Sequence, residues 1–314
     1  MSLNLDALRA AVATHGRVVR VLIAGHHGSA PREAGTSMLV WAGGQSGTIG
    51  GGALEWQAAA RARDCRESRQ ERLPLGPGLG QCCGGAVTLV YEPFDAEALS
   101  ALPVADGLAL RAIGPEAASE PPLVLRRLQA AARGEGKRPL LRLADGWLLE
   151  PLARPTRDLW IWGAGHVGRA IVATAAPLPD LAITWVDTTG ARFPDRLPAR
   201  VTRRIASAPA GLVPEAPGAA EHLILTYSHA LDLALCHALL GHGFAAAGLI
   251  GSASKWARFR ARLAALGHGP SAIARIRCPI GDPGLGKHPQ AIAVGVVAEL
   301  LRSPALTRGQ QAAR

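Results

Sequence analysis

Three glycines spaced as G-x-G-x-x-G, namely Gly163, Gly165 and Gly168, constrain the fold of this 314-residue chain more than any other feature. An apolar run predicts a strand over 159–162 directly before them, and a helix is predicted to begin within them. The first glycine allows a tight turn, the second lets the backbone approach a phosphate, and the third lets helix and strand pack closely. The N-terminus of the helix then offers free N–H groups to an anion, with His166 beside them as a further donor.

An acidic residue in the expected place completes this dinucleotide-type fingerprint. Asp187 ends the next predicted strand, 19 residues after Gly168. We expect its carboxylate to accept a hydrogen bond from a ribose hydroxyl and to disfavour a 2′-phosphate. Two interpretations stay open: the domain binds a nucleotide, or it keeps the turn for another phosphate ligand or for none.

Alternating strands and helices predict the fold class of the second half. Further apolar strands over 222–227 and 246–250 are each followed by a helix, which is typical of a doubly wound parallel sheet. We therefore predict an α/β protein in which a small N-terminal α+β domain precedes a C-terminal Rossmann-like domain.

The predicted domain boundaries follow changes in pattern along the chain. Residues 1–114 form the α+β domain, 115–156 form a connecting segment with a helix and a hairpin, and 157–314 form the Rossmann-like domain. The first domain is predicted to begin with a helix from Leu5 to a C-cap at Gly16, a strand over 18–24 and a loop at His26-His27. A hairpin of 36–41 with 47–49 and a helix over 53–69 are expected next. A loop over 73–80 and a strand over 86–91 complete the domain.

A triple glycine precedes the predicted helix of the first domain. Gly50, Gly51 and Gly52 have the pattern of an anion-binding nest of backbone N–H groups. Glu55 follows in the first turn of the helix, where a negative charge is favoured. The alternative interpretation is a plain turn followed by an acid that stabilises the helix.

Two adjacent cysteines form the second site-like element of this domain. Gln81, Cys82, Cys83 and Gly84 lie in a glycine-rich loop, and thiolates are soft metal ligands and good nucleophiles toward sulfur. Because neighbouring side chains point apart in an extended chain, we expect one cysteine to be a ligand and the other a structural neighbour. Zinc is not expected, since no C-x-x-C spacing or nearby histidine cluster accompanies the pair.

Several polar residues follow the other predicted strands of the second domain. His229 and Asp232 come after one strand, and Lys255 follows the next. Ligands of open α/β sheets bind at such carboxyl ends. For Lys255 we slightly favour a solvated helix face over a ligand contact.

The net charge of +10 is concentrated in the second domain. Residues 1–114 carry 10 basic and 10 acidic groups, whereas 156–314 carry 17 basic and 9 acidic groups, a net +8. The arginines are scattered and aromatic residues make up only 4%, so no nucleic acid is expected. A phosphate-bearing cofactor or an acidic protein partner fits the charge better. The five cysteines are too few for a disulfide scaffold, and neither a signal peptide nor a membrane span is predicted, so a cytoplasmic protein is expected.

Taken in order, the motifs resemble one family over nearly the whole chain, the XdhC accessory proteins of xanthine dehydrogenase. They are Gly-Ser-Ala-Pro-Arg (28–32), Ile-Gly-Gly-Gly-x-Leu-Glu (49–55), Gln-Cys-Cys-Gly-Gly (81–85), Gly-Ala-Gly-His-Val-Gly (163–168), Gly-Leu-Ile-Gly-Ser (248–252) and Cys-Pro-Ile-Gly (278–281).

The resemblance implies a role as a chaperone and not as an enzyme. Such proteins bind molybdenum cofactor, a pterin dithiolene that carries a phosphate, and present it to a cysteine desulfurase that converts Mo=O to Mo=S. They then hand it to apo xanthine dehydrogenase, so the implied partners are this enzyme, the desulfurase and the proteins of molybdenum cofactor biosynthesis. A homo-oligomer, with a dimer as the commonest form, is also expected.

The same resemblance assigns roles to the candidate residues. Cys82 or Cys83 would contact the molybdenum or receive sulfur, and Gly50–Gly52 or Gly163–Gly168 would hold the phosphate. The alternative function is an NAD-dependent oxidoreductase that uses the fingerprint and Asp187, with His166 or His229 as the proton relay. That alternative leaves the cysteine pair unexplained.

Overall fold

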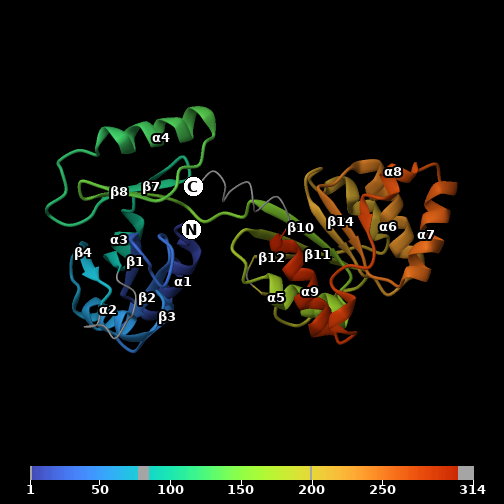
Figure 1. Cartoon of the computed structure of the whole chain (residues 1–314), viewed down its shortest axis with the longest axis horizontal. Coiled ribbons are helices and arrows are strands. Elements are labelled where there is room, and N and C mark those ends of the chain that lie inside the picture. The colour runs from blue at the N-terminus through green and yellow to red at the C-terminus, as the bar shows by residue number, and fades with distance from the viewer. Residues whose placement is uncertain (1, 77–84, 199, 303–314) are drawn as a thin grey trace. The chain divides into compact units, whose positions relative to one another are not determined.

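The computed structural model describes residues 2–76, 85–198 and 200–302 (Figure 1). It divides into two compact units, Met1–Ala153 and Arg154–Arg314. The predicted connecting segment, 115–156, supplies a helix and two paired strands, and all three belong to the first unit. Within the described residues, every helix is too short or too polar to span a bilayer.

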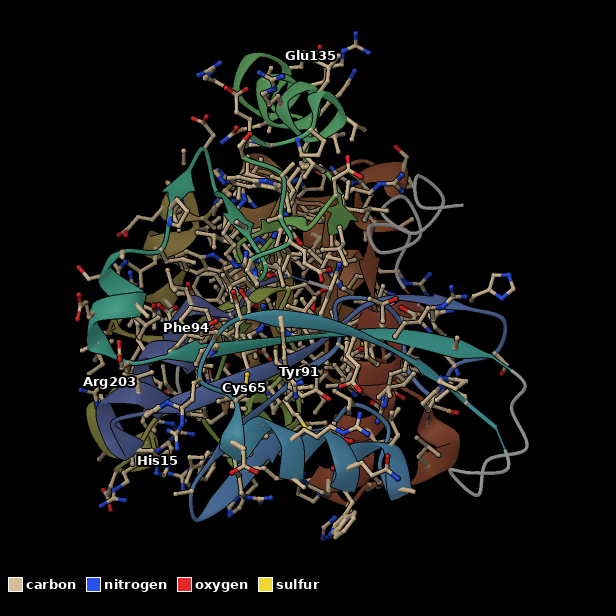
Figure 2. All side chains as sticks on the ribbon, turned by 90° about the vertical axis from the view of Figure 1, so that its left-hand side faces the viewer. His15, Cys65, Tyr91, Phe94, Glu135 and Arg203 are labelled. Carbon is tan, nitrogen blue, oxygen red and sulfur yellow. The ribbon has the colours of Figure 1, made fainter. Side chains whose placement is uncertain are left out.

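A five-stranded antiparallel sheet forms the base of the first unit, in the order β3-β2-β1-β5-β4. Its strands are β1 (Val18–His27), β2 (Ser37–Trp41), β3 (Gly44–Gly47), β4 (Arg69–Pro74) and β5 (Ala86–Phe94). Side chains alternate between the two faces of the sheet. One face, with Val21 of β1 and Tyr91 of β5, packs on α2 (Gly52–Asp64), and Cys65 belongs to the same core (Figure 2).

A second, four-stranded sheet covers the opposite face of the first. Its order is β6-β7-β9-β8, and its strands are β6 (Val104–Ala105), β7 (Leu108–Ala112), β8 (Arg142–Ala144) and β9 (Trp147–Pro151). Leu22 and Val90 of the first sheet pack on Leu148 of the second. The outer face of the second sheet packs on α4 (Leu123–Glu135). The unit is thus built in the layer order α2, sheet, sheet, α4 (Figure 1), with α1 (Leu5–His15) and α3 (Ala96–Ser100) packed at one side.

Four buried charges join the two sheets. Arg20 of β1 donates to Glu150 of β9 through Nη2–Oε1 at 2.6 Å and Nη1–Oε2 at 2.9 Å, and it lies 3.2 Å from Glu92. Arg111 of β7 donates two hydrogen bonds to Glu92, from Nε to Oε1 at 2.5 Å and from Nη2 to Oε2 at 2.9 Å. Burial opposes ionisation of Glu150, but Arg20 and Arg111 lower its pKa. Two positive and two negative side chains therefore balance each other in the interior.

The second unit is a six-stranded parallel sheet in the order β12-β11-β10-β13-β14-β15. Its strands are β10 (Arg157–Trp162), β11 (Leu181–Asp187), β12 (Val201–Ile205), β13 (Glu221–Ile224), β14 (Ala246–Leu249) and β15 (Ile276–Arg277). Numbered along the chain, this is the 3-2-1-4-5-6 order of the Rossmann fold. The predicted fold class, a small α+β domain followed by a doubly wound parallel sheet, is confirmed.

Helices cover both faces of this sheet (Figure 1). On one face, α5 (His166–Ala175) and α9 (Pro289–Arg302) pack on residues such as Ile161. On the other face, α6 (His229–His242), α7 (Ala253–Ala265) and α8 (Pro270–Ile273) pack around Trp162. Three 3-10 helices, Gly190–Arg192, Pro209–Glu215 and Pro283–Leu285, lie in the connections. The strand order reverses between β10 and β13, so a crevice is expected at their carboxyl ends.

Some local predictions for the first unit were wrong. The hairpin is present, but its second strand is β3 and not 47–49, and β1 continues through His26-His27, which was predicted as a loop. The helix predicted over 53–69 ends at Asp64, because the backbone of the next residue, Cys65, is extended with φ −69° and ψ 119°; the carbonyl oxygen of Cys65 accepts from the Arg17 side chain. β4 then occupies part of the predicted loop.

Candidate functional site

Two of the three fingerprint glycines of the second unit are required by close backbone contacts, and the third faces open space. A Cβ on Gly163, whose φ is 126°, would lie 2.3 Å from the Leu225 carbonyl oxygen, and one on Gly168 would lie 2.1 Å from the Gly163 oxygen. Only glycine fits at these positions. A Cβ on Gly165 would meet no atom within 4 Å. The structure therefore leaves open space at the start of α5, where His166 is exposed and a phosphate would meet backbone N–H groups.

Asp187, the fingerprint acid, is turned toward the protein. Its side chain is 3% exposed. Oδ2 accepts from the Ala164 N–H at 2.5 Å, and Oδ1 accepts from the Thr188 N–H at 2.6 Å. Oδ1 also lies 2.9 Å from Nε of Arg192. Both carboxylate oxygens thus have partners within the protein, and the predicted contact with a ribose stays a prediction.

Arg192 lies beside this acid and contacts Tyr227, although neither residue was among the predicted site residues. The guanidinium carbon of Arg192 lies 4.3 Å from the centroid of the Tyr227 ring, which follows β13 and is 61% exposed. Arg169 of α5 donates to the Arg192 carbonyl oxygen at 2.5 Å. The sequence shows both residues but gives no signal that residues 35 positions apart stack at the carboxyl ends of β11 and β13.

A second polar cluster lies at the ends of β13 and β14. Asp232 is fully buried and accepts from the Thr226 N–H at 3.0 Å and hydroxyl at 2.7 Å. Its other oxygen accepts from Lys255 Nζ at 2.6 Å, which also donates to the Ile250 carbonyl oxygen at 2.8 Å. The favoured prediction of a solvated face was therefore wrong for Lys255, whose side chain is 11% exposed because it closes this cluster. Burial raises the pKa of the neighbouring Cys278 thiol, and Lys255 opposes the shift.

The triple glycine of the first unit already holds a carboxylate. Gly50, Gly51 and Gly52 all have positive φ, at 126°, 75° and 65°. The Glu55 side chain folds back onto this loop and accepts hydrogen bonds from Gln45, Thr48, Ile49 and Gly51. Burial opposes ionisation, but these hydrogen bonds lower the pKa of Glu55. The negative charge in the nest is thus the protein's own, and binding of a ligand at these glycines stays a prediction.

Three motifs of the first unit meet at this end of its sheet. A Cβ on Gly50 would lie 2.7 Å from Cβ of Pro31, so the glycine loop contacts the segment that contains Pro31. A Cβ on Gly85 would lie 2.3 Å from the carbonyl oxygen of Ser29, and the Leu75 N–H donates to the Gly85 oxygen at 2.7 Å. The remaining predicted residues, Gln81, Cys82, Cys83 and Gly84, lie outside the described residues. The chain on either side of them is anchored, at Leu75 and at Gly85.

Two family models match the chain. The XdhC Rossmann domain matches residues 159–300, and the XdhC and CoxI family matches residues 11–75. No curated protein matches the sequence.

Comparison with solved structures shows the fold. A Bacillus halodurans protein described as a xanthine dehydrogenase has a TM-score of 0.69 at 19% identity, covering 98% of this chain and 96% of that chain. A Rossmann-fold NAD(P)-binding family protein from Shigella flexneri has a TM-score of 0.33 at 13% identity, covering 48% of this chain and 88% of that chain. A Veillonella parvula short-chain dehydrogenase/reductase in complex with NADP has a TM-score of 0.26 at 17% identity, covering 46% and 64%. The Bacillus halodurans structure thus shares the fold of this chain over nearly its whole length.

Proposed function

Because the chain belongs to the XdhC family, we propose that it acts as a maturation factor for xanthine dehydrogenase by binding molybdenum cofactor. The protein protects the cofactor, supports its sulfuration by a cysteine desulfurase and delivers it to the apoenzyme. It carries cargo and does not itself catalyse a reaction. Family membership supports the role in maturation, and the binding, sulfuration and delivery steps are the proposal.

The observation that carries the proposal is the meeting of three motifs in the first unit. Gly50 packs on Pro31, and Gly85 packs on Ser29, next to the segment that contains Cys82 and Cys83. Gly85, the last residue of the cysteine motif, is thus held by close backbone contacts beside the motif that contains Ser29. Thiolates are soft donors of the kind that binds transition metals, so either cysteine suits the molybdenum of the cargo.

Two loops are predicted to hold a phosphate, and the proposal leaves both open. In the first unit, the amides of Ile49 and Gly51 already donate to Glu55, so a phosphate at this loop would have to displace that carboxylate. In the second unit, a Cβ on Gly165 would meet no atom within 4 Å, so the backbone at the N-terminus of α5 is open to an anion.

A retention assay tests the binding step. The full chain is incubated with molybdenum cofactor and desalted, and molybdenum and oxidised pterin are measured. We expect the wild type to retain both, and Cys82→Ser or Cys83→Ser to lose most of the molybdenum, because serine is a poor soft-metal ligand. Cys278→Ser, in the second unit, is the matched control and should retain cofactor like the wild type. No pterin retained by the wild type would overturn the proposal, and full retention by both variants would move the site away from the pair.

A reconstitution assay tests sulfuration and delivery. Cofactor-loaded protein is treated with a cysteine desulfurase and L-cysteine, then mixed with apo xanthine dehydrogenase, and the recovered activity is compared with that from free cofactor. We expect the loaded protein to give more active enzyme, and more strongly when free cofactor is left to decay first. Equal activity from both sources would contradict the protection and delivery steps.

One observation favours the alternative, an NAD-dependent oxidoreductase, since the second sheet has the strand order of dinucleotide-binding domains. Against it, Asp187 uses both of its oxygens within the protein. Saturable NADH binding together with turnover of a substrate would support this alternative.

A further inference from the structure

The fingerprint loop of the second unit leaves its backbone open at Gly165 but does not offer the usual ribose acceptor. A Cβ on Gly165 would meet no atom within 4 Å, so a phosphate can approach the backbone there. In NAD-binding domains, the acid at the end of the second strand accepts from the 2′-hydroxyl of the ribose. Here that acid, Asp187, is directed into the loop, where it holds the Ala164 N–H, and its other oxygen faces Thr188 and Arg192. A free ribose hydroxyl would have to compete with these partners.

A cation occupies the place beside the acid. Nε of Arg192 lies 2.9 Å from Oδ1 of Asp187, and its guanidinium carbon lies over the Tyr227 ring, 4.3 Å from the centroid. The Arg192 side chain is 33% exposed. Its terminal nitrogens, Nη1 and Nη2, form no hydrogen bond with any residue that the structure describes. Asp187 and Tyr227 thus hold the guanidinium in place while two N–H-bearing nitrogens are left available for a ligand.

A guanidinium in this arrangement is suited to a phosphate monoester. Its N–H groups can bind two phosphate oxygens at once, and such charge-assisted hydrogen bonds are about twice as strong as neutral ones. In NADP-binding domains, an arginine near the end of the second strand accommodates the 2′-phosphate. The second unit also carries a net +8 over residues 156–314, which attracts a more highly charged anion.

We infer that the crevice of the second unit selects a dinucleotide with a phosphate on its adenosine ribose over the same dinucleotide with a free 2′-hydroxyl, and that Arg192 determines this selectivity. The inference reverses the expectation from sequence, in which the charge of Asp187 disfavours a 2′-phosphate. Arg192 neutralises that charge and directs its free donors to the ligand. The selectivity is independent of cofactor binding at the cysteine loop of the first unit.

Binding measurements on the full chain test this inference. Dissociation constants for NADP⁺ and NAD⁺ are measured by calorimetry at one fixed salt concentration, because phosphate contacts depend on salt. We expect NADP⁺ to bind at least about tenfold more tightly, which corresponds to ~1.4 kcal/mol. Arg192→Ala should weaken NADP⁺ binding until the two constants agree within about twofold, with NAD⁺ binding little changed.

Two further variants keep the test decisive. Arg262→Ala removes one exposed positive charge from α7 and should leave the preference for NADP⁺ intact, which separates a local contact from net charge. Arg192→Lys keeps the charge without the two-pronged donor and should retain only part of the preference. Equal or tighter binding of NAD⁺ by the wild type, no binding of either dinucleotide, or an unchanged preference in Arg192→Ala would each overturn the inference. Pterin retention by the cysteine variants is a separate readout, so failure of either idea is recognised independently.

Discussion

Replacing Arg20 by methionine would leave the two buried carboxylates of the first unit with a single arginine. Arg20 makes three hydrogen bonds to these carboxylates, two to Glu150 and one to Glu92. Both acids are almost completely buried, so water cannot replace the lost partner. Removing one member of a buried ion pair costs ~3–5 kcal/mol, and we expect the first unit of Arg20→Met to lose stability in this range.

The structure also predicts which second change restores stability. In Arg20→Met/Glu150→Leu, the pair of Arg111 with Glu92 keeps both of its short hydrogen bonds, at 2.5 Å and 2.9 Å. One positive and one negative charge then remain and balance. Since apolar replacement of a balanced buried pair is often close to neutral, we expect the double variant to lie within ~2 kcal/mol of the wild type. The double variant should therefore be more stable than the single one.

Urea denaturation followed by hydrogen exchange and mass spectrometry measures both variants in the full chain. Peptides from β1, β5 and β9 report on the cluster, and peptides from β10 and β13 in the second unit are the internal control. The reasoning is refuted if Arg20→Met loses less than ~1 kcal/mol, or if the double variant is less stable than the single one.

The fingerprint glycines and a buried histidine give two more predictions. Gly168→Ala should destabilise the second unit by up to ~3 kcal/mol, because its Cβ would lie 2.1 Å from a carbonyl oxygen. Gly165→Ala, whose Cβ would meet no atom within 4 Å, should stay within ~1 kcal/mol of the wild type. Similar urea midpoints for the two variants would contradict this prediction. Burial lowers the pKa of His222 to about 4 from 6.5, so the unfolded chain binds a proton first as the pH falls. The free energy of unfolding is therefore not reduced by this histidine above pH 6.5, and it falls as the pH drops from 6.5 to 4. The fall amounts to ~3 kcal/mol, because the pKa values of the folded and unfolded states differ by about 2.5 units. His222→Gln, which keeps an acceptor for the Trp162 N–H, should flatten the loss between pH 7 and 4, and an unchanged pH profile of the urea midpoint would show that another group titrates.

Sequence predicted the second unit well because its constraints are local. The backbone at Gly163 and Gly168 admits no side chain, and the apolar strands around them are buried on both faces, so their hydrophobic runs are continuous. The same reasoning failed for β4, Arg69–Pro74, because an exposed edge strand of polar residues lacks the alternation that signals a strand. Likewise β12, Val201–Ile205, is an edge strand with two arginines and was not predicted.

Contacts between residues that lie far apart along the chain could not be predicted from the sequence. Arg20 interrupts an apolar run, which signals that a partner is needed, but Glu150 lies 130 residues away. The placement of Glu55 in the first turn of α2 was predicted, yet its return onto the glycine loop depends on side-chain hydrogen bonds that spacing does not encode. Arg192 and Tyr227 meet only because β11 and β13 flank β10 in the sheet.

The hydrogen bond from the Ala164 N–H to Asp187 has a consequence for how the fingerprint loop meets a ligand. Since Asp187 at the end of β11 binds the Ala164 N–H, a contact within the protein helps to set the conformation of the loop. A flexible glycine-rich loop would lose conformational entropy on closing around a phosphate, and that loss would weaken binding. The hydrogen bond to Asp187 forms on folding and therefore reduces this entropy cost of binding. Asp187, which in NAD-binding domains would bind the ribose, here stabilises the loop to which a phosphate would bind.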